Sequence, residues 1–181
     1  MRPLINIAII FVLPFAISSS SKEATTANEP TTVVVEDNGK YCNARFDFCV
    51  KFPDLLLTEK IVSDNDDGIR LTSKDGKVCA EISGIYNVGN WSLTDIYDFT
   101  FEDITTDYPD DVKYVSYHIG KTSYDAIFEY GGELHYYKTL LHKNNSIVTL
   151  MIAVPKGMES LLNNLKEDIE IDLHEIAISL N

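Results

Sequence analysis

Apolar and polar residues alternate through most of residues 112–154, and short turn sequences interrupt this alternation three times. A period of two is typical of β-strands that are buried on one face. The turns are Gly120-Lys121, Gly131-Gly132 and Lys143-Asn144-Asn145. Strands joined by so few residues must be antiparallel. The pattern therefore predicts an antiparallel meander of four strands, at residues 112–119, 123–130, 133–142 and 146–154.

Helical periodicity flanks the meander on both sides. Ser92 and Asp95 have the spacing of a capping box, so a helix is expected to begin there and to end at Tyr108-Pro109. The apolar residues of this helix predict one buried stripe, made of Leu93, Ile96, Tyr97, Phe101 and Ile104. Pro155 is expected to open a second helix, whose stripe is Met158, Leu161, Leu162, Leu165 and Ile169. The residues from 171 onward either extend this helix or pack as a tail.

The segment before the first helix carries shorter signals. Residues 41–52 predict a tight hairpin, which Pro53 ends because proline cannot donate to a sheet ladder. Residues 69–73 and 78–86 predict two strands joined at Asp75-Gly76, a common hairpin turn. The chain then holds about eight strands and two helices. We predict an α+β fold in which a mostly antiparallel sheet of six to eight strands is sandwiched by helices.

The first residues predict export from the cytoplasm. Arg2 is followed by a short apolar run and then by small residues, which is the pattern of a secretory signal peptide over residues 1–20. The run is shorter than the roughly 20 residues of a membrane span, although an uncut anchor is the alternative. Residues 21–40 are polar and predict a disordered leader. Residues 41–181 then form one globular domain, secreted or periplasmic and not embedded in a membrane once processed.

The chain has three cysteines, Cys42, Cys49 and Cys79. An exported protein meets an oxidising compartment, so one pair is expected to form a disulfide. Cys42 and Cys49 face each other across the hairpin if Arg45 and Phe46 are the centre of its turn. This pair is our first choice, and a bridge from Cys79 to either partner is the alternative. A cysteine in an alternating strand, as at Cys79, is usually buried.

The sequence is strongly acidic, with a formal net charge of -13 over 181 residues. This charge argues against nucleic acids as partners, because their phosphates are bound by clustered Lys and Arg. It suits a basic protein partner, and it also serves solubility alone. Carboxylates gather around the end of the first helix, where they oppose the helix dipole: Glu102, Asp103, Asp107, Asp110 and Asp111. These predict a binding face for a cation or a basic protein, or else a solvated surface.

The sequence contains no recognisable catalytic motif, such as Gly-x-Ser-x-Gly, a Gly-rich phosphate loop or His-Glu-x-x-His. His118 and His142 could approach each other in the meander as a metal or base site, but we favour ordinary strand histidines that are exposed or hydrogen-bonded. Asp64, Asp66 and Gly68 match only part of a calcium loop. We therefore predict no catalytic residues, no metal site and no cofactor.

The hairpin at residues 43–53, Asn-Ala-Arg-Phe-Asp-Phe-Cys-Val-Lys-Phe-Pro, resembles the opening of the PsbP-like fold group. The order that follows is also similar, with the Asp75-Gly76 turn, one helix, a long meander and a C-terminal helix. That group includes extrinsic proteins of the oxygen-evolving complex, an import factor that binds a GTPase, and exported bacterial proteins. The resemblance implies an antiparallel sheet sandwiched by helices. It implies binding rather than catalysis, and no motif here points to a photosystem.

These observations lead to one main hypothesis and two alternatives. The main hypothesis is an exported, non-enzymatic module that binds another protein through acidic and tyrosine-rich surfaces, and a basic protein is the candidate partner. The alternatives are an immunity or inhibitor protein that neutralises a basic toxin or enzyme, and a small-ligand carrier or hydrolase with a pocket between sheet and helix. Aromatic residues of the meander left exposed would form such a contact surface: Tyr114, Tyr117, Tyr124, Phe128, Tyr130, Tyr136 and Tyr137.

Overall fold

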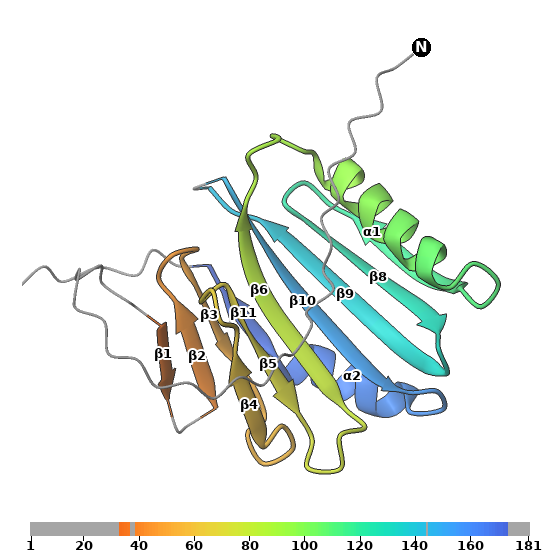
Figure 1. Cartoon of the computed structure of the whole chain (residues 1–181), viewed down its shortest axis with the longest axis horizontal. Helices are drawn as coiled ribbons and strands as arrows, with labels where there is room; N and C mark the ends of the chain where they lie inside the picture. The colour runs from red at the N-terminus through yellow and green to blue at the C-terminus, as the bar shows by residue number, and fades with distance from the viewer. Residues whose placement is uncertain (1–32, 37–38, 144, 174–181) are drawn as a thin grey trace, which may run out of the picture. The chain divides into compact units, whose positions relative to one another are not determined.

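The computed structural model describes residues 33–36, 39–143 and 145–173, so the expected signal peptide lies outside the described residues. The described part contains two antiparallel sheets and two helices (Figure 1). The larger sheet has seven strands in the order β4-β5-β6-β10-β9-β8-β7. Their bounds are Glu59–Val62 (β4), Gly68–Thr72 (β5), Cys79–Tyr86 (β6), Lys113–Ile119 (β7), Ser123–Tyr130 (β8), Glu133–Leu141 (β9) and Ser146–Pro155 (β10).

The four meander strands are neighbours in this sheet, as their short turns predict. The last of them, β10, also pairs with β6, where Leu150 lies opposite Ile82. This position at the centre of the sheet explains why the sequence of β10 is apolar almost throughout, since a central strand is buried on both faces. The α+β class with a mostly antiparallel sheet is therefore confirmed.

The helix α1 (Leu93–Asp107) begins as the capping box predicts. The backbone N–H of Asp95 donates to Ser92 Oγ at 3.2 Å, and the Ser92 N–H donates to Asp95 Oδ2 at 2.9 Å. The inner residues Leu93 and Ile104 of α1 pack on β8, against a cluster that includes Tyr124, Ala126 and Phe128. These β8 residues lie on one face of the large sheet, which we call the α1 face.

The helix α2 (Glu159–Asp168) packs against β9 and β10 on the opposite face. Its buried residues Leu162 and Leu165 belong to the same cluster as Tyr136 of β9. Phe128 lies opposite His135, so Tyr136 must point to the other side of the sheet, which we call the α2 face. The start of α2 differs from the sequence prediction, because Pro155 is the last residue of β10 and not the first of a helix.

A second sheet, which the sequence did not predict as separate, has the order β1-β2-β3-β11. Its strands are Val33–Glu36 (β1), Lys40–Asn43 (β2), Phe48–Lys51 (β3) and Glu170–Asp172 (β11). The predicted hairpin at residues 41–52 supplies its centre. Within the segment expected to be a leader, residues 33–36 form β1 and pair with β2. Residues 170–172 form β11 rather than a continuation of α2.

The small sheet covers the α2 face of the large sheet beside α2. Tyr41, Phe48 and Val50 lie in the same buried cluster as Leu71 and Val148 of the large sheet. The approach is closest at Gly84 of β6, where a Cβ atom would lie only 2.5 Å from the ring of Phe46. The Asn43 side chain adds a hydrogen bond of 2.9 Å to the carbonyl oxygen of Asp66. The α2 face is thus covered by a helix and a sheet together.

Candidate functional site

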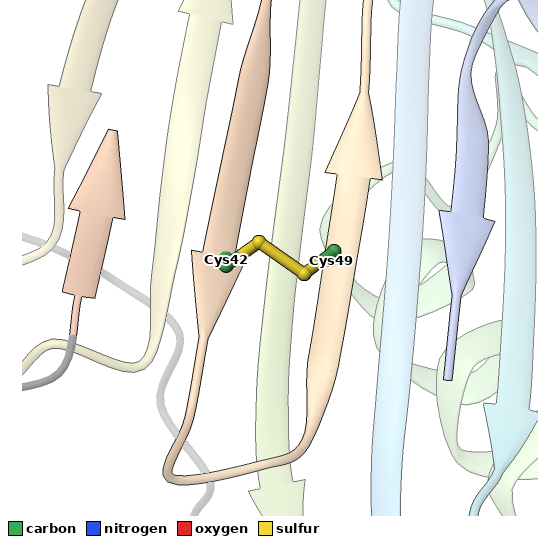
Figure 2. The surroundings of a disulfide bond; sticks show 2 residues. All are labelled: Cys42 and Cys49. Atoms are coloured by element: carbon green, nitrogen blue, oxygen red, sulfur yellow. A yellow bond between two sulfur atoms is a disulfide. The ribbon is translucent and has the colours of Figure 1, made fainter. Parts of the chain in front are cut away.

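The two hairpin cysteines lie directly opposite each other on β2 and β3. Their sulfur atoms are 2.14 Å apart and their Cα atoms 4.1 Å apart, which is disulfide-bonding distance (Figure 2). Both side chains are half-buried and point away from the core, because the neighbouring Tyr41 and Asn43 point into it. The bond ties the hairpin together at a position that carries no other candidate chemistry.

The third cysteine, Cys79, is free and half-buried at the start of β6. Burial, and then the charge of Glu81, raise the pKa of its thiol to about 11. The thiol is therefore protonated at neutral pH, and a thiol in that state is a poor nucleophile and a poor metal ligand.

Aromatic side chains gather where α1 meets the edge strand β7. Tyr97 and Phe101 come from successive turns of α1, and Tyr114 and Tyr117 come from the α1 face of β7. The ring centroids are 5.3 Å apart for Tyr97 and Tyr117, and 5.5 Å apart for Tyr114 and Tyr117. Phe101 and Tyr114 each lie 6.0 Å from the ring of buried Phe128. We call Tyr97, Phe101, Tyr114 and Tyr117 the aromatic strip.

Three members of the aromatic strip remain exposed, by 38% for Phe101, 45% for Tyr114 and 57% for Tyr117. The reason is the placement of α1, which packs over β8 and leaves β7 beyond its cover. Tyr97 lies deeper, and burial is the main cause that raises the pKa of its hydroxyl to about 12, with smaller contributions from Tyr114 and Tyr117. The strip is thus anchored on buried rings and open on its outer side.

The five carboxylates that the sequence singled out are all exposed. Glu102, Asp103 and Asp107 belong to α1, and Asp110 and Asp111 lie in the loop that follows. Burial and then the charges of Asp107 and Glu102 raise the pKa of Asp103. Asp111 has a structural partner, because its Oδ2 accepts a hydrogen bond of 2.8 Å from the N–H of Gly131.

The acidic side chains of α1 have no cationic partner within the described part of the chain. The ion pairs of the described residues lie outside α1, such as Lys113 with Glu129 at 3.1 Å and Lys156 with Glu129 at 2.6 Å. Asp98 lies beside the aromatic strip, because its charge contributes to the raised pKa of Tyr97 and it precedes Phe101 by three positions in the helix. Glu102 lies one turn after Asp98 on the same row of the helix. An apolar strip beside uncompensated carboxylates is therefore the main feature of this surface.

The structure does not bring His118 and His142 together. His118 lies opposite Asp125, which in turn lies opposite Lys138 of β9. His142 follows four residues after Lys138, which displaces it by about 13 Å along the strand. The His142 Nε2 atom instead lies 2.8 Å from the carbonyl oxygen of Leu173. In the described residues, no group of three or more His, Cys, Asp or Glu side chains could hold a metal ion.

Polar side chains of the turn that carries the partial calcium motif form hydrogen bonds with one another. Asp67, which stands where the motif has no ligand, accepts from Ser63 Oγ at 2.7 Å and from Asn65 Nδ2 at 2.8 Å. Gly68 is required for packing, since a Cβ atom there would lie 2.3 Å from the carbonyl oxygen of Ile82. The polar residues of this turn are explained by its conformation.

The sequence signals located part of the aromatic strip and missed another part. Tyr114 and Tyr117 stand among the meander aromatics whose exposure would make a contact surface. Phe101 is exposed although the helical stripe predicted it to be buried. The signal that could have placed it is the position of Phe101 about 80° around the helix axis from Leu93, because this offset widens the stripe beyond what β8 alone can cover.

Within the described residues, neither helix is long and apolar enough to cross a bilayer. A scan against models of known protein families and a search of curated proteins both found no match to this chain.

Solved structures do match the fold. The solution structure of cyanobacterial PsbP (CyanoP) from Synechocystis sp. PCC 6803 aligns with a TM-score of 0.53 at 5% identity, over 83% of this chain and 98% of that one. The Ran-binding protein Mog1p of Saccharomyces cerevisiae aligns with a TM-score of 0.50 at 10% identity, over 74% and 95%. Identities this low show a shared fold and no more. The chain therefore has a PsbP-like fold, as the hairpin and the order of elements predicted.

Proposed function

We propose that this protein is an exported, non-enzymatic module that binds another protein through the aromatic strip. The observation that carries the proposal is the exposure of Phe101, Tyr114 and Tyr117 side by side on α1 and β7. Exposed aromatic rings that lie together are costly for solubility, and contiguous apolar patches of this kind mark interaction sites.

The strip has the properties of a binding surface that is already organised. Its rings are held by stacking on Tyr97 and Phe128, so little side-chain entropy is lost when a partner covers them. Aromatic residues of this type supply most of the energy in many interfaces. The outer edge of β7, on the side away from β8, is not paired to any strand in the described part of the chain.

The charge around the strip favours a basic partner. Asp98 and Glu102 border it, and neither forms an ion pair within the described residues. A partner with Lys or Arg at the rim of the contact would be steered to this surface and would offset the net charge of -13. Neutralisation of a basic toxin or enzyme is one specific form of this function.

Export rests on residues 1–20 and on the hairpin cysteines. The pattern of Arg2, a short apolar run and small residues is that of a signal peptide. A cysteine pair at bonding distance suits a secreted or periplasmic protein, where disulfides persist. Mog1p is a Ran-binding protein, so binding to another protein is one use of this fold, and this support is by analogy alone.

The proposal is tested by capture from the secreted or periplasmic fraction of the producing organism. Phe101→Ala removes one exposed ring of the strip, and a partner held by it is expected to bind about tenfold more weakly or worse. Phe99→Ala is the matched control, because Phe99 is exposed by 48% on the same helix but stacks on Trp91, away from β7. A partner captured equally by both variants would contact another surface and would contradict the proposal.

A further inference from the structure

The four end strands of the two sheets differ in length. β7 has seven residues, whereas β4 and β1 have four each and β11 has three. An unpaired edge offers a row of backbone N–H and C=O groups to another chain, and proteins usually keep such edges short or distorted. β7 is thus the end strand best able to pair with a further strand.

Only the first half of β7 has a feature that discourages pairing with a further strand. Its register with β8 shifts between Tyr114 and Ser116, so Val115 has no opposite residue, and such a bulge discourages pairing. Residues 116–119 pair regularly with β8, and no strand of the described residues pairs with their outer side. Lys113, the lysine of this strand, is already paired with Glu129. The unprotected half of the edge therefore lies at residues 116–119, beside the ring of Tyr117.

A strand added to this edge would have two distinct faces. On the α1 face its side chains would lie beside Tyr117 and within reach of Tyr114, because neighbouring strands are about 4.8 Å apart. On the α2 face they would lie beside His118, which has Asp125 as its own neighbour. The carboxylate that α1 carries beside the strip is that of Asp98, whose charge acts on the Tyr97 hydroxyl, and Glu102 lies one turn further along the same row of the helix.

This arrangement selects the chemistry of the added strand. A guanidinium or ammonium group over the face of Tyr117 would gain a cation–π contact, and the carboxylates of α1 would attract it further. A carboxylate in the same place would be repelled by Asp98 and Glu102. The same carboxylates disfavour a second copy of this acidic chain at the edge.

We propose that β7 binds an extended, basic segment of the partner as an additional strand along residues 116–119, with Lys or Arg at the alternate positions that face the aromatic strip. This inference rests on the proposed function and specifies its partner and its mode of binding. Main-chain hydrogen bonds would supply affinity, and the alternate cationic side chains would supply specificity.

The test uses protein expressed from the full-length sequence and three synthetic hexapeptides: Arg-Val repeated three times, Glu-Val repeated three times, and the Arg-Val peptide with alternate backbone amides N-methylated. Binding is followed by amide hydrogen exchange and by NMR shift changes. The Arg-Val peptide is expected to slow exchange at residues 116–119 and to bind at least tenfold more tightly than the Glu-Val peptide. N-methylation is expected to abolish binding, because it removes the donors of an added strand.

Two variants locate the site. Tyr117→Ala is expected to weaken the Arg-Val peptide about threefold to fivefold through loss of the cation–π contact, whereas Phe99→Ala leaves its affinity unchanged. Absence of peptide binding overturns strand addition, and so does equal binding of the N-methylated or the Glu-Val peptide. Protection of residues 116–119 that rises with protein concentration alone would assign the edge to a second copy and also overturn the inference. In each case the capture experiment with Phe101→Ala still decides the proposed function by itself.

Discussion

The two faces of the large sheet differ in how much of their surface is covered by other elements. The α2 face packs aliphatic and aromatic side chains under α2 and the small sheet, and Phe48, Leu71 and Val148 there are fully buried. The α1 face is covered by one helix, and its buried set around Phe128 is much smaller. It also contains more hydroxyl groups, such as the pair Tyr130 and Tyr137, whose oxygen atoms are 2.6 Å apart.

This difference shows how a single sheet can separate folding from recognition. The helix and the small sheet on the α2 face supply most of the apolar burial, which is the dominant favourable contribution to stability. Incomplete cover on the α1 face leaves aromatic rings of α1 and β7 open without endangering the core. We therefore expect substitutions on the α2 face to change stability, and substitutions in the aromatic strip to change binding.

Removal of a buried ring on the α2 side should have a severe effect. Phe48→Ala leaves a cavity between the two sheets and is expected to lower the free energy of unfolding by about 4 kcal/mol. Urea unfolding followed by circular dichroism measures this loss. A loss below about 1 kcal/mol would mean that the small sheet adds little to the core, and the contrast between the faces would not hold.

Acid should act on the α1 face. Burial lowers the pKa of His135 from its ordinary 6.5 to about 4, against a smaller opposing effect from a hydrogen bond with the Tyr130 backbone. The unfolded chain therefore binds more protons between these values, so stability falls as the pH falls from 6.5 to 4, by about 3 kcal/mol at the lower limit. On the α2 face, the pKa values of Tyr41 and Tyr136 are about 12, so these groups do not titrate in acid.

The measurement compares urea unfolding at pH 7 and pH 4.5 for the unmodified protein and His135→Phe. The phenyl ring can replace the imidazole in its stack on Tyr130, where the ring centroids are 3.8 Å apart, but it cannot be protonated. The variant should lose clearly less stability on acidification. Equal losses for both proteins would assign the acid response to other groups.

The hairpin disulfide should contribute less, because it closes a short loop. Cys42 and Cys49 are separated by seven positions, for which the loss of loop entropy predicts about 2 kcal/mol of stabilisation. Cys42→Ser/Cys49→Ser is expected to lower the free energy of unfolding by that amount, and a reducing agent should have the same effect on the unmodified protein. Cys79→Ser serves as the control, and reduction should destabilise it just as much. If reduction changes nothing, the bond does not stabilise the small sheet.

The sequence predicted the parts of the fold that local patterns determine. Alternation and turn residues predict the meander, and residue spacing predicts the capping box at Ser92. The turn of the hairpin predicts that Cys42 pairs with Cys49. The sequence did not predict the short strands β4 and β11, because three or four residues become a strand only when a neighbouring strand pairs with them. The separation into two sheets depends on contacts such as Phe46 with Gly84, which are distant in sequence.

The sequence predicted which residue types form the candidate site, but not which of these residues lie together on the surface. The sequence identified the tyrosines of the meander and the carboxylates of α1 as candidates for binding. It could not show that Tyr114 and Tyr117 stay exposed while Tyr124 is buried, because this depends on α1 packing mainly on β8 and reaching the edge strand β7 only through Tyr97. Nor could it show that Asp111 is used to hold the turn at Gly131.

The attachment of α1 can be weakened at its first turn. Ser92→Ala removes the cap on the Asp95 N–H and is expected to cost about 1 kcal/mol. The same change should raise the pKa of Asp95, which is now lowered mainly by its side-chain hydrogen bond with Ser92. Unfolding measurements and NMR titration of this carboxyl group test the two effects. Ser92→Thr, which keeps a hydroxyl at the cap, should restore most of the stability.

The outermost ring of the aromatic strip should matter least for stability. Tyr117 is exposed by 57% on a strand with one neighbour, so Tyr117→Ala is expected to lower the free energy of unfolding by no more than about 0.5 kcal/mol. Urea unfolding of this variant beside Phe48→Ala then compares one ring from each region in the same units. A large loss at Tyr117 would mean that the strip serves to hold α1 and β7 together, and its exposure would then be incidental. A small loss together with weaker peptide binding would separate recognition from folding within one sheet.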